Sequence, residues 1–362
     1  MEFTNDILIN TQSKKEYNIV YSKYFYRLSK ELSPDSGRVR TLERKSDRIN
    51  DCLNLWLWDV YHKNRIMDLQ RVNRCWDNRF CPNCKKLNLS SAIHNFSPHF
   101  KKLLDEGYNP YLLTLTIPNV SGDKLRETIT IMNKAFRKFF NLFNYDLNGT
   151  TQKGFSERLI KFDAAYKVLE ITCNNQTNTY HPHLHIIMFS KEYKPIHFEK
   201  VYPGPYRKKS QSYTKLSEMD IHIMQLWKMC FDGIRLSKNN FESMSTDWID
   251  LYLCDIREMD SSGIYEVMKY TFKDTDIQNY YNFKDIFLSL ENKRIRQGYG
   301  LLYNVKCEEE DGEKQLLDEF MNDKEESPDK LLTRSINELI TVYKDYTKIS
   351  RFNSHDEFSN LD

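Results

Sequence analysis

Two histidines separated by a single leucine, His183 and His185, are the residues of this sequence best suited to hold a metal ion. They lie in the segment YHPHLHIIM, whose apolar residues predict a strand. Because side chains alternate between the two faces of a strand, both imidazoles would lie on one face and Leu184 on the other. Two imidazoles placed in this way can chelate a divalent cation, which would polarise a scissile phosphate and orient it for in-line attack.

A third protein ligand is expected beside the two imidazoles, and the sequence offers two candidates. Glu170 lies in AYKVLEIT, which predicts the neighbouring strand of a hairpin and can bring a carboxylate across to the imidazoles. His181 has the same parity as His183 and His185, so it would share their face if the strand begins early enough. Pro182 favours a chain that is still turning there. We therefore favour Glu170 and keep His181 as the alternative.

A glutamate, a lysine and a tyrosine in the run YEVMKY form a second set of residues suited to catalysis. On a helix, Glu266 and Tyr270 lie about 40° apart around the axis and face the same way. Tyrosine, whose ordinary pKa is about 10, needs its phenolate or the attacked phosphate stabilised, which Lys269 and a bound cation would do. Tyr265, the competing nucleophile, would point about 140° away from Tyr270. The alternative interpretation is that this run only packs a helix.

Eight cysteines stand at positions 52, 75, 81, 84, 173, 230, 254 and 307, and no secretory signal accompanies them. They are therefore better interpreted as thiols or metal ligands than as disulfides. Cys75, Cys81 and Cys84 cluster, and Cys-x2-Cys is typical of a zinc knuckle, although a closed structural site needs four ligands. Candidates for the fourth ligand are Cys52, His94 and His99, and simple reduced thiols are the alternative to zinc. Neighbouring basic residues suited to phosphate contacts are Arg71, Arg74, Arg79, Lys85 and Lys86.

The elements that must position these residues alternate between strands and helices. The segment YLLTLTIP predicts a strand, and the apolar spacing that follows it predicts a long helix. Two strands separated by the turn-rich CNNQTNTYHP predict a hairpin. The expected strands are 111–118, 165–172, 183–190 and 248–256, and the expected helices are 125–144, 221–231 and 265–273. This order predicts an α+β domain with an antiparallel β-sheet core, flanking helices and peripheral N-terminal and C-terminal segments.

Four regions are expected along the chain. They are a polar, poorly structured or peripheral N-terminal arm (1–50), a cysteine-containing region packed on the catalytic domain (51–105), a catalytic domain (106–300), and an acidic linker with a C-terminal helix (301–362). Residues 308–326 hold ten acidic and two basic side chains, so the rest of the chain is basic despite a net charge of +2. A basic body with an acidic tail fits a protein that binds a polyanion.

The composition is that of a globular protein, with 40% hydrophobic and 29% charged residues among 362. No run approaches the roughly 18 consecutive apolar residues of a membrane span, and the N-terminus lacks a targeting pattern. The expected compartment is the cytoplasm, with no membrane partner.

Three motifs in a fixed order, LLTLTIPN, then EIT with YHPHLHIIM, then YEVMKYTFKD, resemble those of the rolling-circle replication initiator (Rep) proteins of small Gram-positive bacterial plasmids, which belong to the HUH endonuclease superfamily. The resemblance covers roughly residues 70–276, and RCWDNRFCPNCKK also resembles a cysteine-containing region of these initiators. In that family the first motif is a structural strand, the second holds the metal and the third carries the nucleophile.

The resemblance implies that His183 and His185 bind Mg²⁺ or Mn²⁺ and that Tyr270 nicks a plasmid origin. The product would be a 5′-phosphotyrosyl link with a 3′ hydroxyl for a polymerase. Glu266 matches a carboxylate that activates water for the terminating cleavage in one branch of the family. Since the chain lacks a G-x-x-x-x-G-K-[ST] run, a host helicase is expected beside the host DNA polymerase. Origin DNA, single-stranded or hairpin at the nick site, is the expected substrate. A homodimer is one oligomeric state in which the protein would bind it.

Two other functions are kept as alternatives. A relaxase or a transposase would use the same chemistry on a different DNA. A zinc-containing DNA-binding protein that does not cut would tolerate Tyr270→Phe without loss of function.

Overall fold

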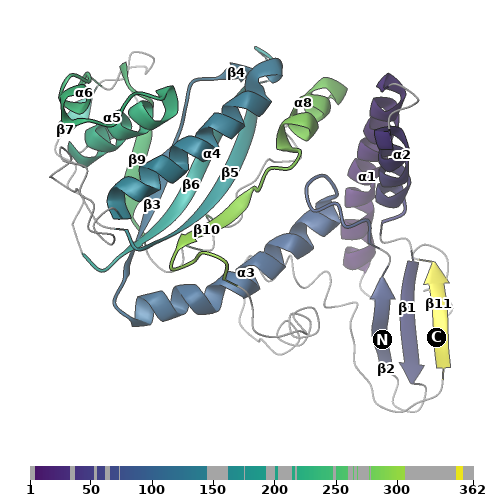
Figure 1. The fold of residues 1–362 in the computed structure, drawn as a ribbon. Helices are drawn as coiled ribbons and strands as arrows, with labels where there is room; N and C mark the ends of the chain where they lie inside the picture. Colours follow the sequence, from purple (N-terminus) through teal and green to yellow (C-terminus); the bar gives the residue numbers. More distant parts are fainter. Residues whose placement is uncertain are drawn as a thin grey trace. The chain divides into compact units, whose positions relative to one another are not determined.

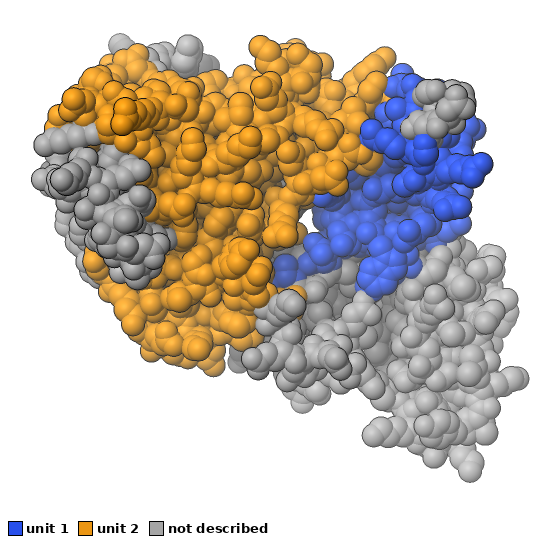
Figure 2. Space-filling view, in the orientation of Figure 1, with its two compact units in different colours: residues 1–94, 307–362 blue, residues 95–306 orange. Residues whose placement is uncertain are grey.

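The computed structural model describes most of the chain, with gaps. The described residues are 5–32, 37–52, 55–61, 66–72, 74–144, 162–174, 176–192, 200–202, 214–216, 218–247, 250–259, 264, 267, 277, 279–305 and 348–353. The chain divides into two compact units (Figure 2), of which unit 1 comprises Met1–His94 with Cys307–Asp362 and unit 2 comprises Asn95–Lys306.

Unit 2 is built on a six-stranded sheet in the order β10-β5-β6-β3-β9, with the short β4 paired to β6. Every pairing in it is antiparallel. The predicted α+β class with an antiparallel core is therefore confirmed. The strands are β3 (Asn109–Leu115), β4 (Val120–Ser121), β5 (Ala164–Asn174), β6 (Thr179–Ser190), β9 (Cys254–Glu258) and β10 (Arg296–Gly300).

The predicted hairpin is formed by β5 and β6, the two longest strands of this sheet. At its turn the side-chain oxygen of Asn174 accepts hydrogen bonds from the backbone N–H groups of Gln176 and Thr177. Asn178 then adopts a positive φ of 50°, a conformation that asparagine tolerates better than most residues. This local turn chemistry fixes the register that pairs Glu170 with His183.

Helix α4 (Gly122–Asn144) crosses one face of the sheet, as Figure 1 shows. It is the helix predicted over 125–144, and its apolar residues Ile129, Met132, Phe136, Phe139 and Phe140 are buried as expected. Phe136 meets Tyr299 of β10 edge-on, and Phe139 meets Trp227 of α5 (Glu218–Asp232) in the same way. The remaining described helices of this unit are α6 (Lys238–Glu242) and α8 (Tyr280–Leu290), the latter in contact with α4.

The opposite face of the sheet is covered at one end by residues 95–105 of α3 (Pro82–Asp105). Phe96 and Phe100 pack edge-on against Tyr166 of β5, and Phe100 also stacks on Phe189 of β6. These contacts fill the end of the sheet distant from the hairpin turn, on the face that carries the histidine pair.

Unit 1 contains α1 (Asn5–Glu31), α2 (Gly37–Asn50) and a three-stranded sheet in the order β11-β1-β2. Its strands are β1 (Leu55–Tyr61), β2 (Ile66–Val72) and β11 (Lys348–Asn353). Of the two alternatives for residues 1–50, a poorly structured or a peripheral arm, the first is wrong for 5–31 and 37–50, which are helical. The reason is tertiary packing, because Tyr21, Phe25 and Phe80 bury their rings together. Pairing of β11 with β1 also places a C-terminal segment in unit 1.

Several expected elements are shorter than predicted or lie outside the described residues. The strand expected over 248–256 is seen as β9 from Cys254. Within the helix expected over 265–273, Val267 is the residue described, and it is helical like Ile264 before it. The expected C-terminal helix, over residues 331–346, lies outside the described residues. A short antiparallel pair is formed by β7 (Lys200–Tyr202) and β8 (Thr214–Leu216). Among the described helices, none has the length and apolar character to cross a membrane.

Candidate metal centre

Glu170, His183 and His185 meet on one face of the β5–β6 hairpin. The carboxylate oxygen Oε2 of Glu170 lies 2.9 Å from Nε2 of His183 and 2.8 Å from Nε2 of His185. The register explains this convergence, because Glu170 stands directly opposite His183 on the neighbouring strand and His185 follows two residues along the same face. The three potential ligand atoms all lie within 4.8 Å of one another.

The electrostatics of the group favour an ionised carboxylate. Burial by itself would raise the pKa of Glu170, but hydrogen bonds to His183 and His185 lower it to about 2. The side chain of Glu170 is 6% exposed, whereas each histidine side chain is 12% exposed. The group therefore offers two nitrogen ligands and one oxygen ligand at a point that solvent reaches. Two imidazoles with one carboxylate suit Mn²⁺, and also bind softer ions.

Both imidazoles are oriented by a second hydrogen bond on the far side of the ring. Nδ1 of His183 lies 3.0 Å from the backbone oxygen of His181. Since a carbonyl oxygen can only accept, Nδ1 carries a hydrogen, and in the neutral ring Nε2, the atom beside Glu170, then holds the lone pair that an ion would bind. Nδ1 of His185 lies 3.4 Å from the hydroxyl of Thr114 on β3. The neighbouring strand thus helps to aim the second imidazole.

His181, the alternative third ligand, lies beside the group and not in it. Strand β6 begins at Thr179, so Pro182 does not interrupt it and His181 does share the face of His183. Its ring stacks on that of His183, with 5.1 Å between the centroids. Burial lowers the pKa of His181, and the nearby His183 lowers it further. The arrangement favours Glu170 as the third ligand.

The face that carries the imidazoles continues toward β9 with polar side chains that the sequence analysis missed. Thr114 stands opposite His185 on one side and opposite Asp255 of β9 on the other, so the three share a face. Asp255 holds the guanidinium of Arg257 through its Nε at 2.8 Å, and 59% of the Arg257 side chain is exposed. The alternation of polar and apolar residues in CDIRE is the sequence signal that places Asp255 and Arg257 on one face of a strand. A solvent-facing arginine on this face is suited to a phosphate.

The catalytic residues expected from the third motif, Tyr270, Glu266 and Lys269, lie outside the described residues, as does Tyr265. Two neighbours are described. Ile264 and Val267 are helical and each is 2% exposed.

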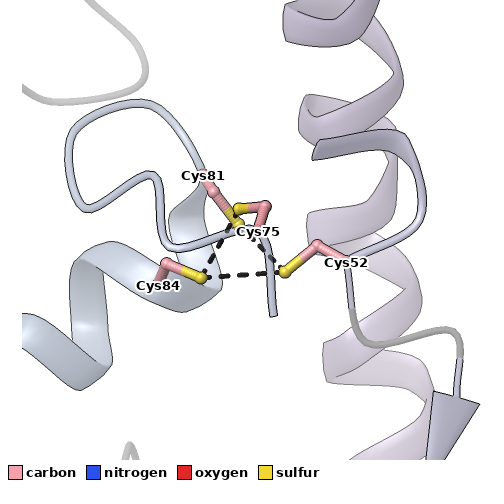
Figure 3. A group of neighbouring side chains, drawn as sticks. All are labelled: Cys52, Cys75, Cys81 and Cys84. Atoms are coloured by element: carbon pink, nitrogen blue, oxygen red, sulfur yellow. Dashed lines mark hydrogen bonds between the residues drawn. The ribbon is translucent and has the colours of Figure 1, made fainter. Parts of the chain in front are cut away.

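The clustered cysteines come together in unit 1 with a fourth. The sulfurs of Cys52, Cys75, Cys81 and Cys84 lie within 4.8 Å of one another, and all four residues are buried (Figure 3). Of the three candidates for the fourth ligand, Cys52 is the one that joins the described group. Hydrogen bonds from the other thiols, that of Cys52 foremost, hold the pKa of Cys84 far below its ordinary value.

Three of the five basic residues expected to contact phosphates have described side chains. Arg74, Arg79 and Lys85 are each half-buried, and the guanidinium carbon of Arg74 lies 3.9 Å from the ring centre of the exposed Trp76. The side chains of Arg71 and Lys86 lie outside the described residues.

Comparison with known proteins gives one family match. Residues 66–202 match the family model described as replication protein. The protein rep of Bacillus amyloliquefaciens is 28% identical over 242 residues, which cover 65% of this chain and 61% of that protein. A protein rep of Bacillus sp is 32% identical over 207 residues, 55% of this chain and 57% of that protein. The protein rep of Staphylococcus aureus is 29% identical over 177 residues, 48% of this chain and 66% of that protein.

The chain therefore spans about three fifths of the length of these relatives. The family match includes the first motif and the histidine pair, and it ends at residue 202, before the expected nucleophile. No solved structure matches the chain.

Proposed function

We propose that this chain, a relative of the Rep replication proteins of Gram-positive bacteria, initiates rolling-circle replication of a plasmid by nicking single-stranded DNA at the origin. The observation that carries the proposal is the convergence of Glu170, His183 and His185 on one face of an antiparallel sheet. A cation at such a place would assist the cutting of DNA by a tyrosine, because it polarises the scissile phosphate and holds it in line.

Glu170, His183 and His185 would hold Mg²⁺ or Mn²⁺, which supplies Lewis-acid polarisation of the phosphate when bound. The residues fit such an ion because an ionised carboxylate and two nitrogens directed at it share one point. Thr114 and the backbone oxygen of His181 would keep the two imidazoles in place. The exposed Arg257 would contact a phosphate of the bound strand.

Tyr270 would be the nucleophile, with Lys269 stabilising its phenolate. The phenolate oxygen forms a bond to phosphorus as the bond to the 3′ oxygen breaks, and the 3′ oxygen takes up a proton to become the primer hydroxyl. Ile264 and Val267 support the helical geometry, because two buried residues three positions apart mark one inward face. On a helix continued from them, Glu266 would lie about 130° and Tyr270 about 90° from the middle of that face. They would then be available to DNA and not to the core.

Glu266 would act as a general base at termination. By accepting a proton from water, Glu266 would allow water to hydrolyse the phosphodiester at the second cleavage, so that the cycle ends without another covalent adduct. The proposal includes a bacterial cytoplasmic location, use of a host helicase and DNA polymerase, and a structural Zn²⁺ at the cysteines of unit 1. A homodimer on the origin is part of the same proposal.

The direct test is incubation with single-stranded oligonucleotides that tile the DNA carrying the gene, in the presence of Mn²⁺. The expected product is a covalent peptide–DNA adduct that maps to Tyr270, is absent in Tyr270→Phe and persists in the matched Tyr265→Phe. An adduct on Tyr265 would overturn the assignment of the nucleophile. Tight binding without any adduct would overturn the nickase and favour the non-cleaving DNA-binding protein. Cleavage of an origin of transfer or a transposon end would instead favour a relaxase or a transposase.

A further inference from the structure

The four cysteines of unit 1 are far apart in the sequence but have adjacent sulfur atoms. The sulfur of Cys52 lies 3.7 Å from that of Cys84 and 3.5 Å from that of Cys81, and Cys75 lies 3.5 Å from Cys84. Cys52 follows the end of α2, Cys75 and Cys81 belong to the loop before α3, and Cys84 lies in its first turn, as Figure 3 shows. We propose that these four thiolates bind one structural Zn²⁺, with Cys52 as the fourth ligand, and that the ion clamps the two ends of the β1–β2 segment.

The spacing of the sulfurs fits a tetrahedral ion. Zinc–sulfur bonds of about 2.3 Å in a tetrahedron place neighbouring sulfurs about 3.8 Å apart. The observed separations of 3.5 to 3.7 Å are close to that value. A disulfide would need its two sulfurs about 2.05 Å apart, so the geometry favours four separate ligands over two bridges.

Hydrogen bonds from backbone N–H groups to side chains within the loop stabilise the conformation of the loop that carries Cys75 and Cys81. The N–H of Asp77 donates to the sulfur of Cys75 at 3.4 Å, and such a bond orients a thiolate that binds a metal. The carboxylate of Asp77 accepts from the N–H groups of Arg79 and Phe80 at 3.0 and 2.8 Å. These bonds hold the loop that carries Cys75 and Cys81 in a defined shape.

An ion pair joins this loop to α2, the helix that ends shortly before Cys52. Nζ of Lys45 on α2 lies 2.6 Å from the buried carboxylate of Asp77. Phe80, which is fully buried, adds edge-on contacts with Tyr21 and Phe25 of α1. The loop and the two N-terminal helices thus form one packed group around the four sulfurs.

The chemistry of the donors selects the ion. Buried thiolates repel one another unless a cation neutralises them, and four sulfur ligands in a tetrahedron select zinc or iron over Mg²⁺ and Mn²⁺. This separates the cysteine site from the group of Glu170, His183 and His185 in unit 2, which offers no sulfur.

The position of the ligands in the chain gives the ion its role. Cys52 lies three positions before β1 begins at Leu55, and Cys75 lies three positions after β2 ends at Val72, so one ion joins the two ends of the segment that forms this hairpin. A small unit with few strands gains much from such a cross-link, since metal binding adds to the free energy of folding. The inference deepens the zinc part of the proposed function and does not depend on DNA cleavage.

The test measures the metal directly in the full chain. The protein is purified under reducing conditions in a His183→Ala/His185→Ala background, so that the cysteines are the site under study. Metal analysis is expected to give about one zinc per chain. Replacement by Co²⁺ is expected to give the charge-transfer absorption of thiolate ligands. Cys52→Ser is expected to release zinc to a chelator at least about tenfold faster and to weaken that absorption. Cys230→Ala, which alters a buried cysteine of α5, is expected to change neither measurement.

Three results would overturn the proposal. Unchanged zinc content and cobalt absorption in Cys52→Ser would remove Cys52 from the ligand set. If His94→Ala then lost zinc and changed the cobalt absorption, His94 would be the fourth ligand. Iron in place of zinc would refute the identity of the ion. A mass deficit corresponding to disulfides in protein purified without reductant, with no metal bound, would replace the clamp by covalent bridges. The origin-nicking assay on the wild-type chain is a separate readout, so failure of either proposal is distinguishable from failure of the other.

Discussion

Replacement of the buried Lys167 by methionine is expected to stabilise unit 2 at neutral pH. Lys167 is on β5, with its side chain directed at α4, where its ammonium donates to the side-chain oxygen of Asn133 and lies 5.7 Å from the ring centres of Phe136 and Tyr299. The residue is fully buried, and burial, with the charge of Arg137, lowers its pKa to about 7 from an ordinary 10.5. The folded chain therefore holds this proton less well than the unfolded chain.

The sign and size of the effect follow from proton linkage. Between pH 7 and pH 10.5 the unfolded state binds more protons, so the free energy of unfolding must rise with pH by up to about 1.4 kcal/mol per pH unit. Between about pH 7 and about pH 10 the rise amounts to about 3 to 4 kcal/mol in the wild type. Lys167→Met removes the titrating group, so this rise disappears and stability at pH 7 increases.

The assay is urea unfolding of the wild type and of Lys167→Met across that pH range, followed by fluorescence. Lys134→Met on the exposed side of α4 is the matched control and is expected to keep the pH dependence of the wild type. The difference between variants isolates Lys167 from tyrosines that titrate in the unfolded chain. Equal slopes for Lys167→Met and the wild type would refute the reasoning, as would a variant that unfolds more easily at pH 7.

Three further predictions concern the proposed reaction. His185→Ala is expected to abolish Mn²⁺-dependent adduct formation while circular dichroism keeps the wild-type spectrum; retained activity would exclude this residue as a ligand. Glu266→Ala is expected to nick normally but lose hydrolytic termination, seen as persistent adduct, and equal loss of both steps would argue for a structural role. Arg257→Ala is expected to reduce the salt dependence of oligonucleotide binding by about one phosphate contact, a slope change of about 0.7 for a single strand. An unchanged slope would place Arg257 outside the interface.

The histidine site was predictable because its geometry is local. Alternation along a strand places His183 and His185 on one face whatever surrounds them. A short turn between two strands brings Glu170 opposite His183, so a hairpin prediction also predicts the third ligand. The strands, the long helix α4 and the α+β class follow from periodicities of two and 3.6 residues in the same way.

The cysteine site was predictable only in part. The spacing of Cys81 and Cys84 is a local signal. Cys52 is separated from Cys84 by 32 positions and was one of three candidates of equal standing for the fourth ligand. Helix α1 was missed because its sequence shows little helical pattern, and burial of Tyr21 and Phe25 against Phe80 becomes visible only in the fold. In α2 the spacing of Leu42, Ser46 and Ile49, which are buried, is a helical signal that was overlooked.

By itself the sequence determined strands β3, β5, β6 and β9, helices α4 and α5, and the pair of imidazoles, because strand alternation and helical periodicity act between neighbours in the chain. Tertiary structure alone decided that Cys52 completes the sulfur group, that β11 pairs with β1, and that Asp255 and Arg257 extend the face of the histidines. These contacts join residues far apart in sequence. Their existence depends on the path of the whole chain and on the burial that this path achieves, which no local pattern encodes.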